Sequence, residues 1–564
     1  MKKAKLDVKL IARGIAVGIL TAAVILFIGL FLMCIPINIH SRGLWLFVTV
    51  TLFISTLVAR LSCRKKDFGR VVISKKTGSK GRHKNYSKFN FNVKPYIPVI
   101  AILVILSLAD VGGSAFFNAE KYASIMDVQE TNFVDTVPES GDTDSIALMD
   151  TASAKMLGDR EIGSLTSVVS QFNVSDDYSQ IDFQGKPVKV SALGYAGFFK
   201  WVNNRDNGAC GYVTVDPVSM SASYRECDGM KYIPSAYFLD NAYRHIWLEY
   251  PTTLFDNLHF EIDENGNPYY VASVYEKTIS LFSGETVTGA IILNPVTGEI
   301  QKYDIADVPR WVDIVFPGNL LCEQYDWYGT LQNGFMNSIM AKKGCKQVTT
   351  YVSDGNGDNV PSADYGYIAK DGDIWIYTGI TSVNGDSSNI GFLTVNERTG
   401  ESRYFDAAGA DEKSAMAAAE GEVQEKGYQA SFPSLINVNG ESTYIMVLKD
   451  DGGLVKLYAA VNVEQYNIVT TAATQAECIE KYKTLLGIES KEEVPAETST
   501  VTVKIADIKY IDIDGNTYIY LIDTDSKIYK AKAAANEEML LLKNGDTVEL
   551  TLDNTKILSC KKMK

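Results

Sequence analysis

The chain carries few of the side chains with which hydrolases and metalloenzymes perform catalysis. It has four histidines in 564 residues, and none of the motifs H-E-x-x-H, G-x-S-x-G or G-x-x-x-x-G-K-[ST] occurs. His245, in the pattern AYRHIW, fits an ordinary position on a helix. We therefore expect no catalytic residues and no cofactor. An envelope hydrolase that uses two carboxylates is the least favoured alternative, because the sequence gives no distance between any two acids.

One acid-rich turn has part of the spacing of a calcium-binding loop. Asp354, Asn356 and Asp358 alternate as the first oxygen ligands of such a loop do. The glycine and the final glutamate of the pattern are replaced by Asn359 and Tyr365. Since Asp and Asn are also the residues that turns prefer, a solvated turn is the favoured interpretation of this metal candidate.

Eight cysteines occur, and six of them follow residue 117. Cys210 and Cys227 bracket a predicted hairpin, so a cross-strand disulfide between them is possible in an oxidising compartment. Spacing alone does not fix the pairing, and two free thiols remain the alternative.

Charge divides the chain into a basic and an acidic part. Residues 1–95 hold 18 of the 54 Lys and Arg residues but only two of the 68 Asp and Glu residues. The acidic remainder argues against nucleic acid as a partner, since it would repel phosphates. The basic charges instead flank three apolar runs, which is typical of membrane topology.

These three runs are Ile11–Ile39, Leu44–Leu61 and Ile97–Phe117. Each approaches the length needed to cross a hydrocarbon core of about 30 Å. A cleaved signal peptide is the alternative for the first run, but no A-x-A site follows it. Because Lys and Arg cluster before the first run and in the loop 62–95, we expect both to be cytoplasmic. The large C-terminal region would then lie outside the cell.

Two features of the predicted anchor point to function. Gly14, Gly18 and Ala22 form a small-residue face, which suits packing among the three spans or oligomerisation through them. Asp110 is an acid near the membrane, and such acids are functional candidates unless paired. Arg42, in the short loop between the first two runs, is its expected partner. The basic loop is interpreted as a topology signal, with lipid or a cytoplasmic partner as alternatives.

The region after residue 150 repeats itself. Residues 211–224, 289–303 and 391–404 each read as an apolar strand, an Asp or Asn turn, and a second strand that ends in Tyr, and 459–466 is a degenerate copy. A second hairpin precedes each copy, and a helical pattern precedes each pair of hairpins at 153–171, 234–248, 318–337 and 411–426. Each unit is therefore predicted to pack one helix across a four-stranded antiparallel sheet.

The predicted fold class is three N-terminal transmembrane helices followed by an α+β ectodomain of repeats and a small β-barrel. The boundaries are an anchor at 1–117, a connector at 118–150, repeats at 151–230, 231–305 and 306–408, a degenerate repeat at 409–488, a linker at 489–499 and a barrel at 500–564. The last segment has five short strands with a helix between the third and fourth. This pattern resembles an OB-fold, although other small barrels share it.

The second repeat carries a family resemblance. Its residues Pro268-Tyr269-Tyr270-Val271, followed by Asn294-Pro295-x-Thr297-Gly298-Glu299-Ile300, resemble the PepSY domain of bacterial cell-surface proteins. The chain as a whole resembles multi-span surface proteins of Gram-positive bacteria. The resemblance implies a non-catalytic protein of the cell envelope, associated with peptidase regulation.

We therefore expect a membrane-anchored scaffold that binds membrane lipid and an extracellular protein, peptide or envelope polymer. A transmembrane sensor or transport-associated regulator that acts through the basic loop is the alternative.

Overall fold

The computed structural model describes residues 8–62, 94–139, 146–349, 351–353, 359–361, 366–383, 388–488, 499–513, 516–525, 527–532, 539, 541–553 and 556–563. The chain forms two compact units, Met1–Ile479 and Glu480–Lys564. Helix α12 (Gln475–Leu485) crosses the boundary between them. The candidate calcium ligands Asp354, Asn356 and Asp358 lie outside the described residues.

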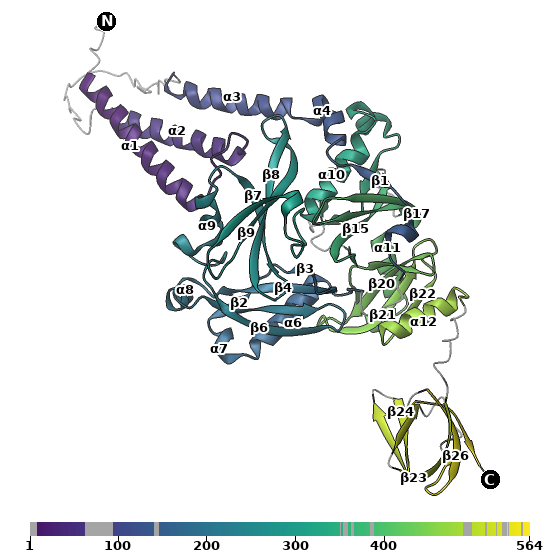
Figure 1. The fold of residues 1–564 in the computed structure, drawn as a ribbon. Helices are drawn as coiled ribbons and strands as arrows, with labels where there is room; N and C mark the ends of the chain where they lie inside the picture. Colours follow the sequence, from purple (N-terminus) through teal and green to yellow (C-terminus); the bar gives the residue numbers. More distant parts are fainter. Residues whose placement is uncertain are drawn as a thin grey trace, which may run out of the picture. The chain divides into compact units, whose positions relative to one another are not determined.

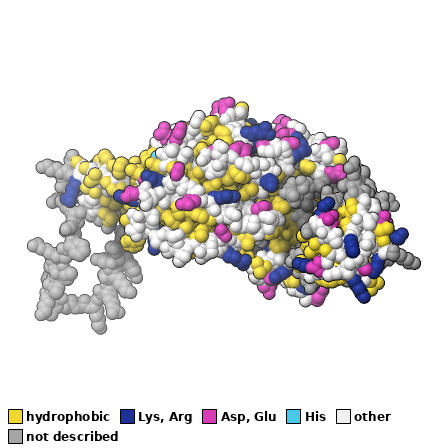
Figure 2. Space-filling model, turned by 60° about the horizontal axis from the view of Figure 1, so that its bottom comes forward, with side chains coloured by type: hydrophobic (Ala, Val, Ile, Leu, Met, Phe, Trp, Pro, Cys, Tyr) yellow, Lys and Arg dark blue, Asp and Glu magenta, His cyan; other side chains and the backbone are white. Residues whose placement is uncertain are grey.

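Unit 1 begins with helices α1 (Val8–Met33), α2 (Arg42–Ser62) and α3 (Ile97–Gly112), the last preceded by η1 (Lys94–Tyr96) (Figure 1). All three are long and apolar enough to cross a membrane, so the predicted apolar spans are confirmed. The third ends at Gly112 rather than Phe117, because the backbone turns extended at Ser114 and a new helix, α4 (Ala115–Ala123), starts there. Figure 2 shows hydrophobic side chains gathered over this helical end, whereas charges are scattered over the remainder.

The small-residue face of α1 packs against α2. Gly14 and Gly18 are buried and Ala22 is half-buried. A Cβ placed on Gly18 would lie 3.0 Å from the Cβ of Ala59 and 3.3 Å from the carbonyl oxygen of Ser55. Close approach of two helix backbones requires such small residues, so this face is used within the chain.

Four sheets follow, which we number 1 to 4 in chain order, and their strands pair antiparallel except for β1 in sheet 3. Sheet 1 contains β2 (Phe172–Val174), β3 (Ser179–Phe183), β4 (Lys186–Tyr195), β5 (Ala209–Asp216) and β6 (Ser221–Met230). Sheet 2 contains β7 (Leu254–Ile262), β8 (Pro268–Ile279), β9 (Ser283–Leu293) and β10 (Ile300–Asp304).

Sheet 3 contains β1 (Val128–Glu130), β11 (Lys346–Val348), β14 (Gly366–Lys370), β15 (Asp373–Ser382), β16 (Ser388–Asn396) and β17 (Ser402–Ala410). A separate pair joins β12 (Tyr351–Ser353) to β13 (Asn359–Pro361). Sheet 4 contains β18 (Gln429–Ala430), β19 (Ser434–Val438), β20 (Glu441–Lys449), β21 (Val455–Asn462) and β22 (Val469–Ala472).

Every sheet contains a meander of two hairpins at the positions that the repeats predict. The meanders are β3-β4-β5-β6, β7-β8-β9-β10, β14-β15-β16-β17 and β19-β20-β21-β22. The second hairpins of sheets 1, 2 and 3 turn through the same left-handed position, where φ is +56° at Met220, +79° at Gly298 and +75° at Gly400. The turn chemistry therefore persists even where methionine replaces glycine.

The predicted helices are present but shorter. They are α6 (Thr151–Gly163) with α7 (Thr166–Val169), η3 (Phe238–Asp240) with α9 (Ala242–Glu249), α10 (Gly318–Leu331), and α11 (Glu412–Gly421) with η6 (Gln424–Lys426). The structure also contains α8 (Phe198–Asn204), η4 (Ile305–Asp307) and η5 (Asn337–Ala341), which the sequence did not predict. Asp411 caps α11 by accepting a hydrogen bond from Ser414 N.

Of the predicted connector 118–150, the described residues 118–139 and 146–150 are part of unit 1. Strand β1 pairs in parallel with β17, and α5 (Phe133–Thr136) follows it. Ser434 Oγ donates a hydrogen bond to Ala147 O at the start of sheet 4. The polar composition of this stretch did not predict these long-range pairings.

Neighbouring sheets share their hydrophobic cores. Sheets 1 and 2 bury Val213 and Tyr270 in one cluster, sheets 2 and 3 bury Val271 and Leu393 in another, and sheets 3 and 4 bury their facing aromatic rings in a third. Because each core belongs to two sheets, the four sheets form a single compact unit.

Unit 2 contains β23 (Ser499–Ile513), β24 (Asn516–Asp523), β25 (Ile528–Lys532), β26 (Thr547–Asp553) and β27 (Lys556–Lys562). The strands pair in the order β23-β24-β25-β27-β26, and β26 pairs again with β23. The β25–β27 pair is parallel and the others are antiparallel.

Candidate functional site: a pocket between the anchor and sheet 2

The segment 34–41, which links α1 to α2, lies directly against sheet 2. Ile37 N donates to Pro251 O at 2.7 Å, and Asn38 Nδ2 donates to Thr252 O at 2.9 Å. The His40 ring nitrogen Nδ1 lies 2.9 Å from Leu281 O, at the turn between β8 and β9. The short loop of the anchor is therefore held by backbone groups of the sheet.

Helix α9 holds the end of α1. Arg244 Nε donates to Phe31 O at 2.8 Å, and its guanidinium lies 4.8 Å from the centroid of the Phe31 ring. Trp247 Nε1 donates to Ile35 O at 2.9 Å. The last carbonyl groups of a helix have no hydrogen-bond partner within the helix, and a cation at that end also interacts favourably with the helix dipole. Arg244 thus completes the end of α1 from outside the helix, and Trp247 holds the segment that follows it.

The β8–β9 turn also contacts the end of α3. Ser280 Oγ donates to Ala109 O at 3.2 Å. Next to this contact, Arg42 forms an ion pair with Asp110, and both side chains are about half exposed. The structure thus brings together the two membrane candidates that the sequence singles out. A paired, accessible carboxylate suits a structural role better than a proton relay.

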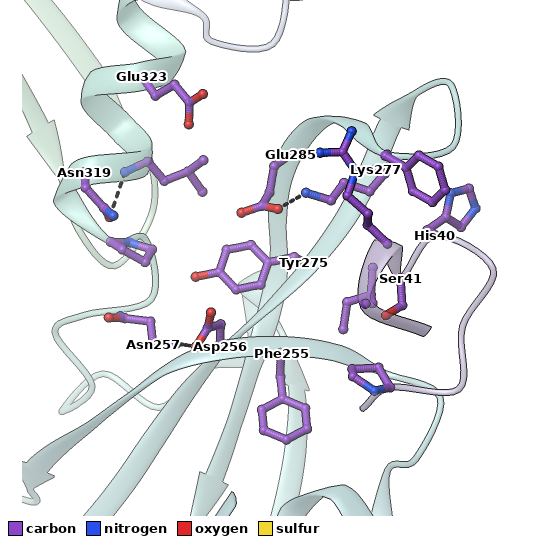
Figure 3. Close-up of a pocket in the computed structure, with 17 residues that line it drawn as sticks. His40, Ser41, Phe255, Asp256, Asn257, Tyr275, Lys277, Glu285, Asn319 and Glu323 are labelled. Carbon is purple, nitrogen blue, oxygen red and sulfur yellow. Dashed lines mark hydrogen bonds and ion pairs between the residues drawn. The ribbon is translucent and has the colours of Figure 1, made fainter. Parts of the chain in front are cut away.

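A cavity of about 670 Å³ opens between these elements. One wall is the segment 36–43 of the anchor, and the others come from β7, the β8–β9 hairpin and the start of α10. Figure 3 shows Tyr275, Glu285 and Asp256 around one open space, with Glu323 and Asn319 of α10 on its opposite side. The hairpin positions its residues because β8 and β9 stay paired as far as Ile279 and Ser283.

The pocket has more carboxylates than cations to match them. Of the two Lys and Arg side chains that line it, Lys277 is paired with Glu285 and Arg42 with Asp110. Asp256 accepts from the backbone N of Asn257, but neither it nor Glu323 forms an ion pair within the described part of the chain. Partial desolvation raises the pKa of the Glu323 carboxyl, and the negative charge of Glu285 adds to the rise. Such a pocket favours a positively charged ligand group.

A second polar network is buried beside the pocket wall, in the core of unit 1. His259 Nε2 lies 2.7 Å from Glu261 Oε1, and the Glu261 carboxylate accepts from the backbone N of Asp313 and of Ile314. Asp313 in turn accepts from Asp182 N at 2.7 Å. Burial, and then the nearby charge of Glu261, raise the pKa of Asp313. These acids accept hydrogen bonds from backbone donors, so the network ties the segment between η4 and α10 to strand β3 of sheet 1 and strand β7 of sheet 2.

The other predicted site residues do not join the pocket. Cys210 and Cys227 are both free thiols in the structure, without the disulfide that their spacing allows. Tyr224 Oη donates to Cys210 O and contacts its sulfur, and burial raises the pKa of Cys227 to about 12. Within the described ranges, no three His, Cys, Asp or Glu side chains are grouped closely enough to hold a metal ion.

Sequence reasoning missed Arg244, Trp247 and all the acids of the pocket. Trp247 lies in the same AYRHIW pattern as His245, which the sequence places correctly on a helix. The only available signal was a helix with Arg and Trp close to an Asn N-cap, and this signal does not indicate a membrane anchor as the partner.

Comparison with known proteins gives no family. No family model matches the chain, and no curated protein is detectably similar. Among solved structures, an apocarotenoid oxygenase from Synechocystis matches at 9% identity and a TM-score of 0.14, covering 70% of this chain and 65% of the oxygenase, slightly under two thirds. A levansucrase from B. megaterium matches at 11% identity and a TM-score of 0.17, covering 80% of this chain and 98% of that one. Scores this low carry no argument about fold or function.

Proposed function

We propose that this chain is a non-catalytic, membrane-anchored binding protein of the cell envelope, whose ligand site is the pocket between the anchor and sheet 2. The observation that carries this proposal is the pair of unmatched carboxylates, Asp256 and Glu323, in a cavity of about 670 Å³. A ligand with a positively charged amine, such as a basic peptide or a polyamine, fits this chemistry. The PepSY resemblance of sheet 2 is consistent with a binding role and remains a prediction.

The site can be tested with full-length protein in lipid nanodiscs and spermidine as the probe. We expect spermidine to raise the Tm of unit 1, and Asp256→Asn or Glu323→Gln to reduce that rise. Asp451→Asn is the matched control, because Asp451 is an exposed acid in the β20–β21 turn, away from the pocket. An equal rise in Tm for all four proteins would contradict the proposal.

The proposed topology has the N-terminus and the loop 62–95 in the cytoplasm and the sheets outside, because Lys and Arg gather on the first side. Labelling of intact cells with a membrane-impermeant maleimide tests this orientation. Tyr466→Cys should react in intact cells, whereas Ser79→Cys should react only after lysis. The opposite pattern would place the sheets inside.

Crosslinking of the protein in its native membrane would identify the partners on each side of the membrane.

A transmembrane sensor is the second candidate function, and it is favoured by the fact that both the anchor and sheet 2 line the pocket. A ligand there would touch both sheet 2 and the segment between α1 and α2. Gly18→Leu should push α1 from α2, because a Cβ at this position already meets Ala59 at 3.0 Å. A changed spermidine affinity in this variant would support coupling between helices and pocket. An unchanged affinity would favour the scaffold.

We also propose that unit 2 is an OB-type barrel. Its strand order and its single parallel pair, β25 with β27, support this assignment. Such barrels bind ligands across one face of their strands, so unit 2 would supply a second binding surface. Loss of partner capture on deletion of 499–564, with the spermidine response retained, would separate the two sites.

A further inference from the structure

A patch of exposed apolar side chains covers α8 and η3. We call it the aromatic patch, and its members are 38–79% exposed: Phe198, Phe199, Val202, Tyr237, Phe238 and Leu239. The ring centroids of Phe198 and Tyr237 lie 5.1 Å apart, so the two segments form one surface. Phe199 is 79% exposed, the same fraction as Phe27 of the spanning helix α1. Soluble surfaces seldom leave so many large apolar groups together in water.

The patch is continuous with the end of α1. Arg244 donates to Phe31 O in α1 and also to Phe238 O in η3. One buried side chain therefore ties the patch to the last turns of a membrane span. Leu32 and Met33, which are 60% and 64% exposed, extend the apolar surface of α1 toward the same place. Figure 1 shows α8 and α9 on the side of the sheets from which α1 departs.

The backbone of η3 is held so that the patch stays exposed. Phe238 has φ of +52°, a left-handed conformation that is unfavourable for a bulky residue. The hydrogen bond from Arg244 to its carbonyl holds this conformation, and the Phe238 ring remains 57% exposed.

Basic side chains flank the aromatic residues on α8. Lys200 and Arg205 belong to the same short segment, FFKWVNNR, and the Arg205 guanidinium lies 5.9 Å from the centroid of the Trp201 ring. Long basic side chains reach phosphate groups while aromatic rings occupy the boundary with the acyl chains. This combination is typical of a segment that lies in a membrane surface.

We propose that the aromatic patch inserts into the lipid leaflet on the sheet-domain side, as a membrane contact separate from the three spans. Lipid is the occupant because α1 necessarily brings that leaflet to the place where Arg244 holds the patch. The insertion would fix the tilt of sheets 1 and 2 against the membrane. It would also hold the mouth of the pocket at the level of the headgroups.

Bromine quenching of tryptophan fluorescence tests the insertion in full-length protein reconstituted into phosphatidylcholine vesicles. The added emission of Phe199→Trp should be quenched by brominated lipid, and more by bromine near the headgroup than near the chain end. Tyr466→Trp is the control, because Tyr466 is a 57% exposed aromatic residue in the loop between β21 and β22, outside the patch. Both changes exchange one exposed aromatic residue for another, so folding should be preserved.

Quenching of Phe199→Trp no greater than that of Tyr466→Trp would overturn the proposal. Binding of a second copy of the chain to the aromatic patch, in place of lipid, would also overturn the proposal. In that case the Phe199→Trp emission would be insensitive to bromine but would change with the protein-to-lipid ratio.

Discussion

Sheets 2 and 4 have the same four-stranded meander, but the two central strands of sheet 2 are longer. Its strands β8 and β9 have 12 and 11 residues, whereas β20 and β21 of sheet 4 have 9 and 8. The extra length carries the β8–β9 turn to the ends of the membrane helices. The turn of sheet 4 is instead closed on itself, with Asp450 accepting from the backbone N of Gly452 and Leu454. The repeat therefore supplies a frame, and extension of one hairpin adds the contact with the anchor.

The two sheets also differ in how they are fastened to the rest of unit 1. Sheet 2 meets the anchor through α9, whose Arg244 and Trp247 bond to backbone carbonyls. Sheet 4 meets the helix of sheet 1 through a charged pair, Lys449 with Asp150. Substitutions at these two joints should separate their contributions.

The largest effect is expected at the anchor joint. Trp247→Ala removes a side chain that is 8% exposed and the hydrogen bond to Ile35 O, so the free energy of unfolding of unit 1 should fall by about 3–5 kcal/mol. Trp247→Phe keeps most of the volume and should cost only about 1 kcal/mol. Denaturant unfolding of detergent-solubilised protein measures both. Equal losses would show that the hydrogen bond dominates the joint.

A slightly smaller effect is expected at the joint of sheet 4. Lys449→Met leaves the largely buried Asp150 carboxylate without its cation, and this should cost about 3 kcal/mol. Lys456→Met is the control, because its partner Asp450 is on the surface and the change should have little effect. If the two variants unfold at the same denaturant concentration, the ion pair contributes nothing to this joint.

Two largely buried acids of unit 1 should make its stability respond to pH in opposite directions. Burial favours the protonated form of Asp150, but Lys449 and Ser153 outweigh it and lower the pKa of this carboxyl overall. Its contribution to stability is therefore present above its unfolded pKa and lost as the pH falls through the folded value. Asp313, beside sheet 2, has a raised pKa. Its folded form holds the proton more tightly, so stability falls as the pH rises from about 4 toward the folded pKa.

The substitution Asp313→Asn tests the expected fall in stability with rising pH. The amide oxygen of Asn can still accept the hydrogen bond from Asp182 N, but it does not titrate. We expect the variant to lose the fall in Tm above pH of about 4 and to keep the fall at lower pH. A Tm profile parallel to that of the unsubstituted protein would show that Asp313 does not titrate in this range.

The smallest effect is expected at the membrane pair. Asp110→Asn breaks a pair whose side chains are about half exposed, so the loss should be less than about 1 kcal/mol. Asp110 does not line the pocket but its partner Arg42 does, so the released cation should weaken the spermidine response slightly. A larger change in either quantity would give this acid a role beyond holding Arg42.

Local sequence predicts the repeating frame well and the joints poorly. Turn residues such as Asn294 and Gly298 specify a hairpin through nearby bonds, so the strands of sheet 2 could be predicted. Arg244 and Phe31 are 213 residues apart in the sequence. Their contact depends on the packing of the whole unit, and no local pattern links them. The pocket could not be predicted for the same reason, because its acids come from three separate elements, β7, β9 and α10.

The pairing of β1 with β17 sets the order in which the chain can fold. Ser402 Oγ donates to Asp127 O across 275 residues, and Val128 lies opposite Ser402 in the ladder. During synthesis, the segment that follows the third span waits until sheets 1 and 2 and most of sheet 3 have been made. Such non-local pairing slows folding and leaves a strand edge exposed in the meantime. The protein should therefore complete its fold late, with its membrane helices already inserted.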